Sequence, residues 1–155
     1  MPEPNRISIA ITPEDLEAGM AGLAAMEEKF NPYLKDLDKG ERKGLPKMGD
    51  KTVNFVGKSL DYTEANPNLV PPYLDKTEFR KDFVAVQTLT TVLRRVEKFH
   101  DMLDDTILLC GSEAYKAALS FYKAVQNAVK LGVPGAEVIY NDLKSRFEKT
   151  KEKSE

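Results

Sequence analysis

The chain has 155 residues, of which 41% are hydrophobic and 31% charged, and its net charge at pH 7 is −2. This length favours a single domain that can bury a core without disulfides or metals. The near-balance of charge provides no field that would attract nucleic acid or an acidic membrane surface, so neither is an expected partner.

The sequence also bears on location. No stretch approaches the roughly 18 consecutive apolar residues of a membrane span, and the N-terminal residues lack the apolar run of a secretory signal. The single cysteine, Cys110, can form neither an internal disulfide nor a cysteine-based metal site. We therefore expect a reducing, cytoplasmic location.

The chain is predicted to begin with an arm and a first helix. Residues 1–11 indicate a short extended arm that either packs on the helices or stays free. Thr12 is a typical N-cap residue and Pro13 suits the first helical position, so a helix is predicted from there. Pro32 removes a backbone donor, and we expect a kink or break near Asn31. One face of this helix is marked by Leu16, Met20, Leu23, Met26 or Glu27, Phe30, Leu34 and Leu37.

A loop and a second helix are predicted next. Glycines and charges make residues 38–49 a solvated loop. Asp50 can cap a helix that runs to about Ala65, where Asn66 and Pro67 stop it. Its apolar face consists of Val53, Val56, Leu60 and Thr63.

The longest predicted helix runs from about Lys76 to Cys110. Asp75 can cap it, and Glu78 stands where a capping box needs an acid. Its apolar residues keep steps of three or four until Gly111, which is predicted to end it. They are Phe79, Phe83, Val86, Leu89 or Thr90, Leu93, Val96, His100, Leu103 and Ile107.

Two shorter helices are predicted to follow. Ser112 can cap the first of them, Gly132 can end it, and Pro134 starts the last helix. The residues expected to face inward are Tyr115, Leu119, Tyr122, Val125 or Gln126, Val129, Val138 or Ile139, Leu143 and Phe147.

These elements predict an all-α fold, an antiparallel helical bundle of four to five helices around one long central helix. The expected organisation is an N-terminal arm over residues 1–11, a single helical-bundle domain over 12–150, and a charged tail over 151–155.

Several stretches of the last two-thirds of the chain resemble a group of small, uncharacterised bacterial helical proteins. These stretches are Met48–Thr52, Asp104–Thr106, Gly111–Tyr115, Val133–Ala136 and Ile139–Leu143. The resemblance implies an all-α fold in a bacterial cytoplasm. It implies no activity and carries over no site residue.

A Glu-x-x-His pair, Glu97 with His100, is the first candidate for chemistry. In di-iron bundles this spacing aims a carboxylate and an imidazole at one metal pair, but the site needs the motif twice. Because the chain has one histidine, a di-iron site is not expected. The plainer interpretation is a half-buried His100 on the apolar stripe, bonded to a carboxylate or carbonyl, and the sharper one is a ligand or proton-transfer residue.

Acidic residues and tyrosines supply the other candidates. Asp101 and Asp104 lie close to His100 along the helix and, with Glu97, could bind a metal cation, the alternative being a solvated face. Tyr115 and Tyr122 are seven residues apart, so they share a helix face and could line a ligand pocket, although such a pair is more often core. Cys110 near a helix end is an apolar packing residue in this interpretation rather than a nucleophile.

No catalytic residues are predicted, and no cofactor can be named. The leading functional hypothesis is a non-enzymatic scaffold or protein-interaction module that self-associates or binds a protein partner. The alternative is a bundle that binds a small ligand or metal near His100. An enzyme built on a carboxylate pair is the weakest hypothesis, because the sequence cannot show which carboxylates meet.

Overall fold

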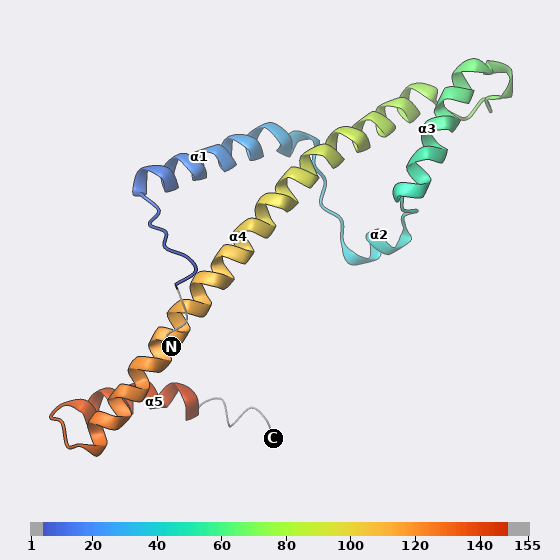
Figure 1. Cartoon of the computed structure of the whole chain (residues 1–155). Coiled ribbons are helices and arrows are strands. Elements are labelled where there is room, and N and C mark those ends of the chain that lie inside the picture. The colour runs from blue at the N-terminus through green and yellow to red at the C-terminus, as the bar shows by residue number, and fades with distance from the viewer. Residues whose placement is uncertain (1–4, 149–155) are drawn as a thin grey trace. The chain divides into compact units, whose positions relative to one another are not determined.

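The computed structural model describes residues 5–148. Over these residues the chain forms five α-helices and two single 3₁₀ turns and contains no strand, which confirms the predicted all-α class (Figure 1). The start of the arm and the charged tail 151–155 lie outside this range. The described residues form two compact units, a first unit of residues 9–98 and a second unit of residues 5–8 with 99–148.

Helix α1 (Pro13–Phe30) of the first unit begins as the sequence predicts. The Thr12 hydroxyl accepts a hydrogen bond from the Asp15 amide at 3.1 Å, and this satisfies one of the free donors of the first turn. The helix ends in a 3₁₀ turn, Asn31–Tyr33, which contains Pro32. The predicted break near Asn31 is therefore confirmed.

A short helix, α2 (Lys39–Gly44), stands where the sequence predicts only a loop. Asp38 caps it by accepting from the amides of Gly40 and Glu41 at 2.7 and 2.9 Å, and the Glu41 carboxylate accepts from the Asp38 amide at 2.9 Å. This reciprocal capping box offsets the poor helix propensity of the two glycines. The loop prediction was wrong because it weighed the glycines and overlooked the box.

Helix α3 (Asp50–Ala65) has the predicted length, but Gly49 rather than Asp50 is its N-cap residue. Leu60 is buried, and the other predicted face residues, Val53, Val56 and Thr63, are half-buried. The helix forms an antiparallel hairpin with the start of α4 (Figure 1). A Cβ at Gly57 would lie 3.1 Å from Cζ of Phe83, so the glycine leaves room on α3 for the Phe83 ring of α4.

Helix α4 is continuous from Lys76 to Lys130, a span of 55 residues. Asp75 caps it by accepting from the amides of Thr77 and Glu78 at 2.8 and 3.1 Å. The predicted end at Gly111 is wrong. One helical glycine costs only about 1 kcal/mol relative to alanine, no proline follows before Lys130, and the φ of Gly111 is not positive, so nothing there breaks the helix.

Two glycines reverse the chain between α4 and α5 (Ala136–Glu148) in the second unit. Gly132 and Gly135 adopt φ values of 70° and 81°, in the left-handed region that glycine occupies without strain. The Val133 amide donates to the Ala128 carbonyl at 3.0 Å, which closes the end of α4. Helix α5 then returns along α4.

The buried face of α5 differs from the predicted one. Ala136 is buried and Tyr140 and Leu143 are half-buried, whereas Val138 and Ile139 are 75% and 44% exposed. The turn of Gly132–Gly135 starts the helix two residues after Pro134, and the resulting rotation brings Ala136 and Tyr140 toward α4. The predicted inward position of Phe147 concerns a side chain outside those described.

Candidate functional site

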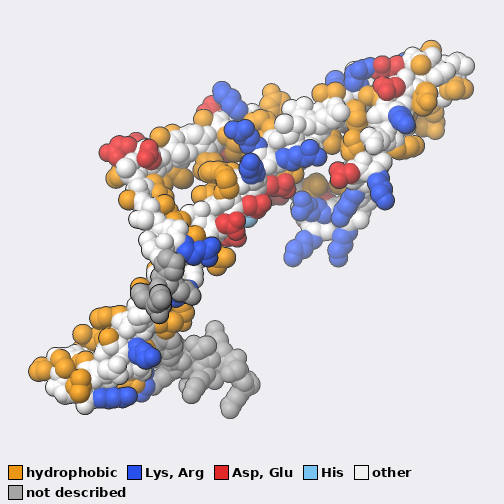
Figure 2. Space-filling model, viewed as in Figure 1, with side chains coloured by type: hydrophobic (Ala, Val, Ile, Leu, Met, Phe, Trp, Pro, Cys, Tyr) orange, Lys and Arg blue, Asp and Glu red, His pale blue; other side chains and the backbone are white. Residues whose placement is uncertain are grey.

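Apolar surface left without cover is the main feature of both units. Among the described residues only three hydrophobic side chains are buried, namely Leu60, Val125 and Ala136. Apolar side chains recur over the visible faces of the helices in Figure 2. A soluble protein rarely leaves a large continuous apolar patch exposed unless something binds there. The apolar faces of α1 and α4 are therefore the candidate site.

In the first unit the apolar stripe of α1 is only partly covered. Met26 and Phe30, near its C-terminal end, are half-buried, whereas Leu16 and Met20 near its start are each 58% exposed. The stripe that the sequence predicts is real. Its first half, however, contacts no other element deeply enough to be buried.

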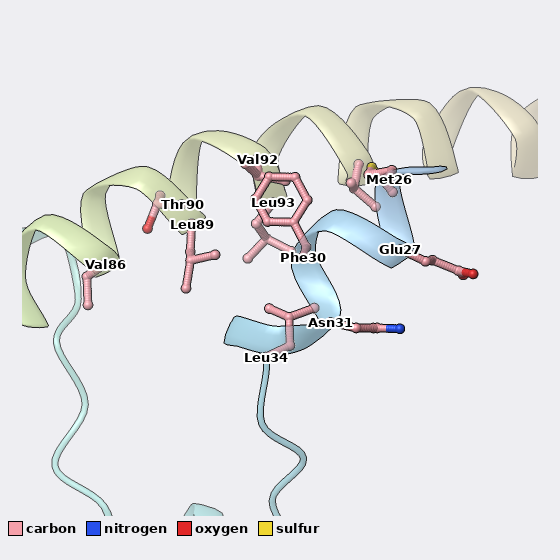
Figure 3. Close-up of a pocket in the computed structure, with 11 residues that line it drawn as sticks. Met26, Glu27, Phe30, Asn31, Leu34, Val86, Leu89, Thr90, Val92 and Leu93 are labelled. Carbon is pink, nitrogen blue, oxygen red and sulfur yellow. The ribbon is translucent and has the colours of Figure 1, made fainter. Parts of the chain in front are cut away.

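A groove of about 520 Å³ lies between the end of α1 and α4 in this unit. Phe30 and Leu34 point toward Leu93 and Leu89 across it, while Glu27 and Asn31 point away (Figure 3). The full lining is Met26, Glu27, Phe30, Asn31, Leu34, Val86, Leu89, Thr90, Val92, Leu93 and Val96. Because the side chains that face one another across the groove are apolar, it suits an apolar partner.

In the second unit the exposed apolar residues lie along α4. Leu103 and Ile107, two members of the predicted face, are 48% and 68% exposed. Others that are exposed are Phe99, Met102, Leu108, Tyr115, Leu119 and Phe121. The predicted inward orientation of Tyr115 and Leu119 is thus wrong, because α5 covers only the end of α4 around Val125.

The N-terminal arm contacts α4 beside this surface. The Arg6 amide donates a hydrogen bond to Oε1 of Glu113 at 2.6 Å, and Ile7 is half-buried. Leu109 and Cys110 of α4 are half-buried as well. The packed state of the arm is therefore observed at Arg6 and Ile7, whereas Ile9 and Ile11 are 56% and 70% exposed.

The structure places His100 in solvent. Its side chain is 75% exposed, and Nδ1 lies 3.3 Å from Oδ1 of Asp101, which is 77% exposed. The prediction of a half-buried histidine was wrong, because the described residues of its unit leave this turn of α4 uncovered. The carboxylate partner is the one part of that prediction that holds.

The other predicted site residues do not gather around His100. Glu97 and Asp104 are exposed on the same helix, and among the residues described here no three His, Cys, Asp or Glu side chains are placed to hold a metal. Tyr115 is fifteen residues along α4 from His100, which is about 22 Å at the rise of an α-helix, so the two cannot line one pocket within a chain. The metal and ligand hypotheses remain predictions.

Tyr122 has a different role from the predicted one. Its ring stacks on Tyr140 with centroids 5.8 Å apart, and Nζ of Lys144 lies 5.9 Å from the centroid of Tyr140. Burial, and secondarily hydrogen bonding with Tyr140, raises the pKa of Tyr122. The sequence signal for this contact is the four-residue spacing of Ala136, Tyr140 and Lys144 on one face of α5.

No known protein family, curated protein or solved structure matches this chain. None of the helices among residues 5–148 combines the length and the apolar character that crossing a membrane requires. Any functional statement therefore has to rest on the physical properties of the chain itself.

Proposed function

We propose that this chain is a non-enzymatic protein-interaction module that completes its hydrophobic core with a protein partner. One observation carries the proposal. The described helices bury only three apolar side chains, while long stripes of α1 and α4 remain exposed. Helices of this length gain most of their stability from burying such a stripe, so a partner that covers it would stabilise the fold.

The character of the surface also supports a protein partner over a small substrate. The groove and the stripes are lined by aliphatic and aromatic side chains, and obligate protein interfaces resemble such a divided core. A net charge of −2 would barely oppose association with another protein. A cytoplasmic setting, which the single cysteine favours, remains part of the proposal.

Concentration dependence tests the proposal. We expect thermal unfolding of the purified full chain to shift upward with protein concentration, or the isolated chain to show poorly protected amides in α1 and α4 by hydrogen exchange. The first result means that the partner is present in the sample, and the second that it is missing. A monomer that unfolds cooperatively at a concentration-independent temperature with fully protected α4 amides would refute the proposal.

A further inference from the structure

The exposed face of α4 in the second unit has a regular order of side-chain sizes. Six residues at alternating steps of three and four share this face, and we call them the seam: His100, Leu103, Ile107, Cys110, Ala114 and Ala117. All but the half-buried Cys110 are exposed. Such spacing places a continuous row of side chains along one side of a helix, as in a coiled coil.

The large and small members of the seam are separated. The first three, His100, Leu103 and Ile107, are large, and the last three, Cys110, Ala114 and Ala117, are small. Two helices pack closely when the large residues of one helix lie opposite small residues of the other helix. The best partner for the seam is therefore a helix with small residues first and large residues last. A second copy of α4 in antiparallel orientation presents this order.

We propose that the seam is the contact surface for a second copy of this chain, with the two α4 helices antiparallel and centred between Leu108 and Leu109. This inference rests on the proposed function and names its partner. In this register His100 faces Ala117 of the second copy, Leu103 faces Ala114, and Ile107 faces Cys110. Each contact occurs twice, which is the signature of an isologous two-fold interface.

Charge favours the same orientation. Asp101, Asp104 and Asp105 place three carboxylates within about one turn of α4, whereas residues 106–121 contain only Glu113 and Lys116. A parallel pair would set the two acidic turns side by side, and like charges at that spacing repel. The antiparallel register places each acidic turn beside a nearly uncharged segment. It also spreads the large residues along the whole contact instead of gathering them at one end.

The flanks of the seam are compatible with a close approach. Gly111 lies next to the seam, and no atom lies within 4 Å of where its Cβ would be, so the backbone of a second helix has room there. The arm contacts α4 through Glu113, on the side of Cys110 away from Ile107. The second helix and the arm therefore occupy neighbouring sides of α4.

Site-directed crosslinking tests both the partner and the register. In a Cys110→Ala background, one sample of the full chain carries Leu103→Cys and another carries Ala114→Cys. With a short bifunctional thiol-reactive reagent that carries two maleimide groups, each of which adds one cysteine thiol, we expect the mixed samples to form a covalent dimer and each single variant to form little. The reason is that two copies of either residue lie about 16 Å apart along the helix axis in this register. A Leu108→Cys variant, one residue from the seam and about 100° around the helix, is the matched control.

The outcomes separate this inference from the proposed function. Self-crosslinking of Leu103→Cys would show a parallel pair and overturn the register. A monomeric mass with unprotected α4 amides would exclude the second copy while leaving the interaction module intact. A monomer with protected amides and unfolding independent of concentration would overturn both. Helix content by circular dichroism verifies that each variant folds.

Discussion

The ring of Tyr122 on α4 lies 5.8 Å from that of Tyr140 on α5, with the two planes inclined by only 14°. Val125 and Ala136, which are buried, lie three and four residues from Tyr122 and Tyr140 on the same helix faces. The stack therefore helps to hold α5 against the end of α4. An offset aromatic pair of this kind contributes more than its buried area alone. Because tyrosine hydroxyls ionise at alkaline pH, the stability of this stack depends on pH there.

Stability is expected to fall at alkaline pH because of Tyr122. Its pKa is raised in the folded state, so the folded chain holds this proton more tightly than the unfolded chain. The contribution is fully present below the unfolded value of about 10 and is lost as pH rises through the folded pKa. Denaturant titrations at a series of pH values test this. Because the chain has six tyrosines, the difference in tyrosinate absorbance between the native chain and Tyr122→Phe follows the ionisation of this residue. The Tyr122→Phe variant should lose this part of the pH dependence; an unchanged alkaline profile would contradict the assignment.

Gly57 is expected to tolerate no larger side chain. A Cβ there already lies 3.1 Å from the Phe83 ring, whereas at Gly22 nothing lies within 4 Å. Gly57→Val should lower the free energy of unfolding by about 1–3 kcal/mol through overpacking. By contrast, Gly22→Ala should raise it by about 0.5–1 kcal/mol, because the added methyl meets no atom and alanine lowers the backbone entropy of the unfolded chain. Urea unfolding of both variants measures these differences, and equal effects would argue against the α3–α4 contact.

Ile107→Glu is expected to abolish self-association, since it places a charge in the centre of the seam. The control is Leu108→Glu, because Ile107 and Leu108 are neighbours with exposures of 68% and 70% and differ mainly in which side of α4 they occupy. Sedimentation equilibrium should give a monomer for the first and the unchanged assembly for the second. If both variants dissociate, the contact is not confined to the seam.

His100→Leu is expected to tighten the same association. A polar residue in an apolar seam costs stability although it helps to fix register. Burying leucine there should lower the dissociation constant about tenfold, for a gain of roughly 1.5 kcal/mol. Dilution measured by analytical ultracentrifugation gives the constant. A weaker dimer would instead mean that the imidazole makes a specific contact in the assembly, and metal titration of the native chain would then be the next measurement.

Asp75→Ala is expected to destabilise the start of α4 by about 1 kcal/mol, because two amides lose their acceptor. Asp75→Asn keeps a side-chain oxygen at the same place and should retain most of the stability. Thermal unfolding of the two variants at one protein concentration makes the comparison. Equal losses would show that the negative charge near the helix start, rather than the hydrogen bonds, is the stabilising factor.

Local signals in the sequence predicted most of the helices. Thr12 and Asp75 marked two helix starts because a capping side chain acts on amides two or three residues away. Pro32 marked an end for an equally local reason. The prediction at Gly111 was wrong because a glycine permits a helix to end but does not require it to end. At Gly111 φ is not positive, and the helix continues. At Gly132 the chain does turn.

The candidate site was harder to predict because exposure is not a local property. The stripe containing Leu103 and Ile107 was identified correctly, but the sequence cannot say which element covers it. The half-buried position predicted for His100 assumes that a neighbouring helix covers every apolar stripe. The apolar faces of α1 and α4 exceed what α3 and α5 can cover. The sequence signal for this was that the number of apolar helix faces exceeds the number of helices available to cover them.

The hydrogen bond from Arg6 to Glu113 joins residues 107 positions apart, whereas the hairpin contacts of α3 and α5 with α4 link segments close in sequence. Local contacts form early in folding, and closing a long loop carries an added entropic cost. Helices and hairpins should therefore form first, and the arm should dock afterwards. During synthesis the segment around Arg6 leaves the ribosome long before Glu113 exists, so a part of the chain that is made early finds its place late.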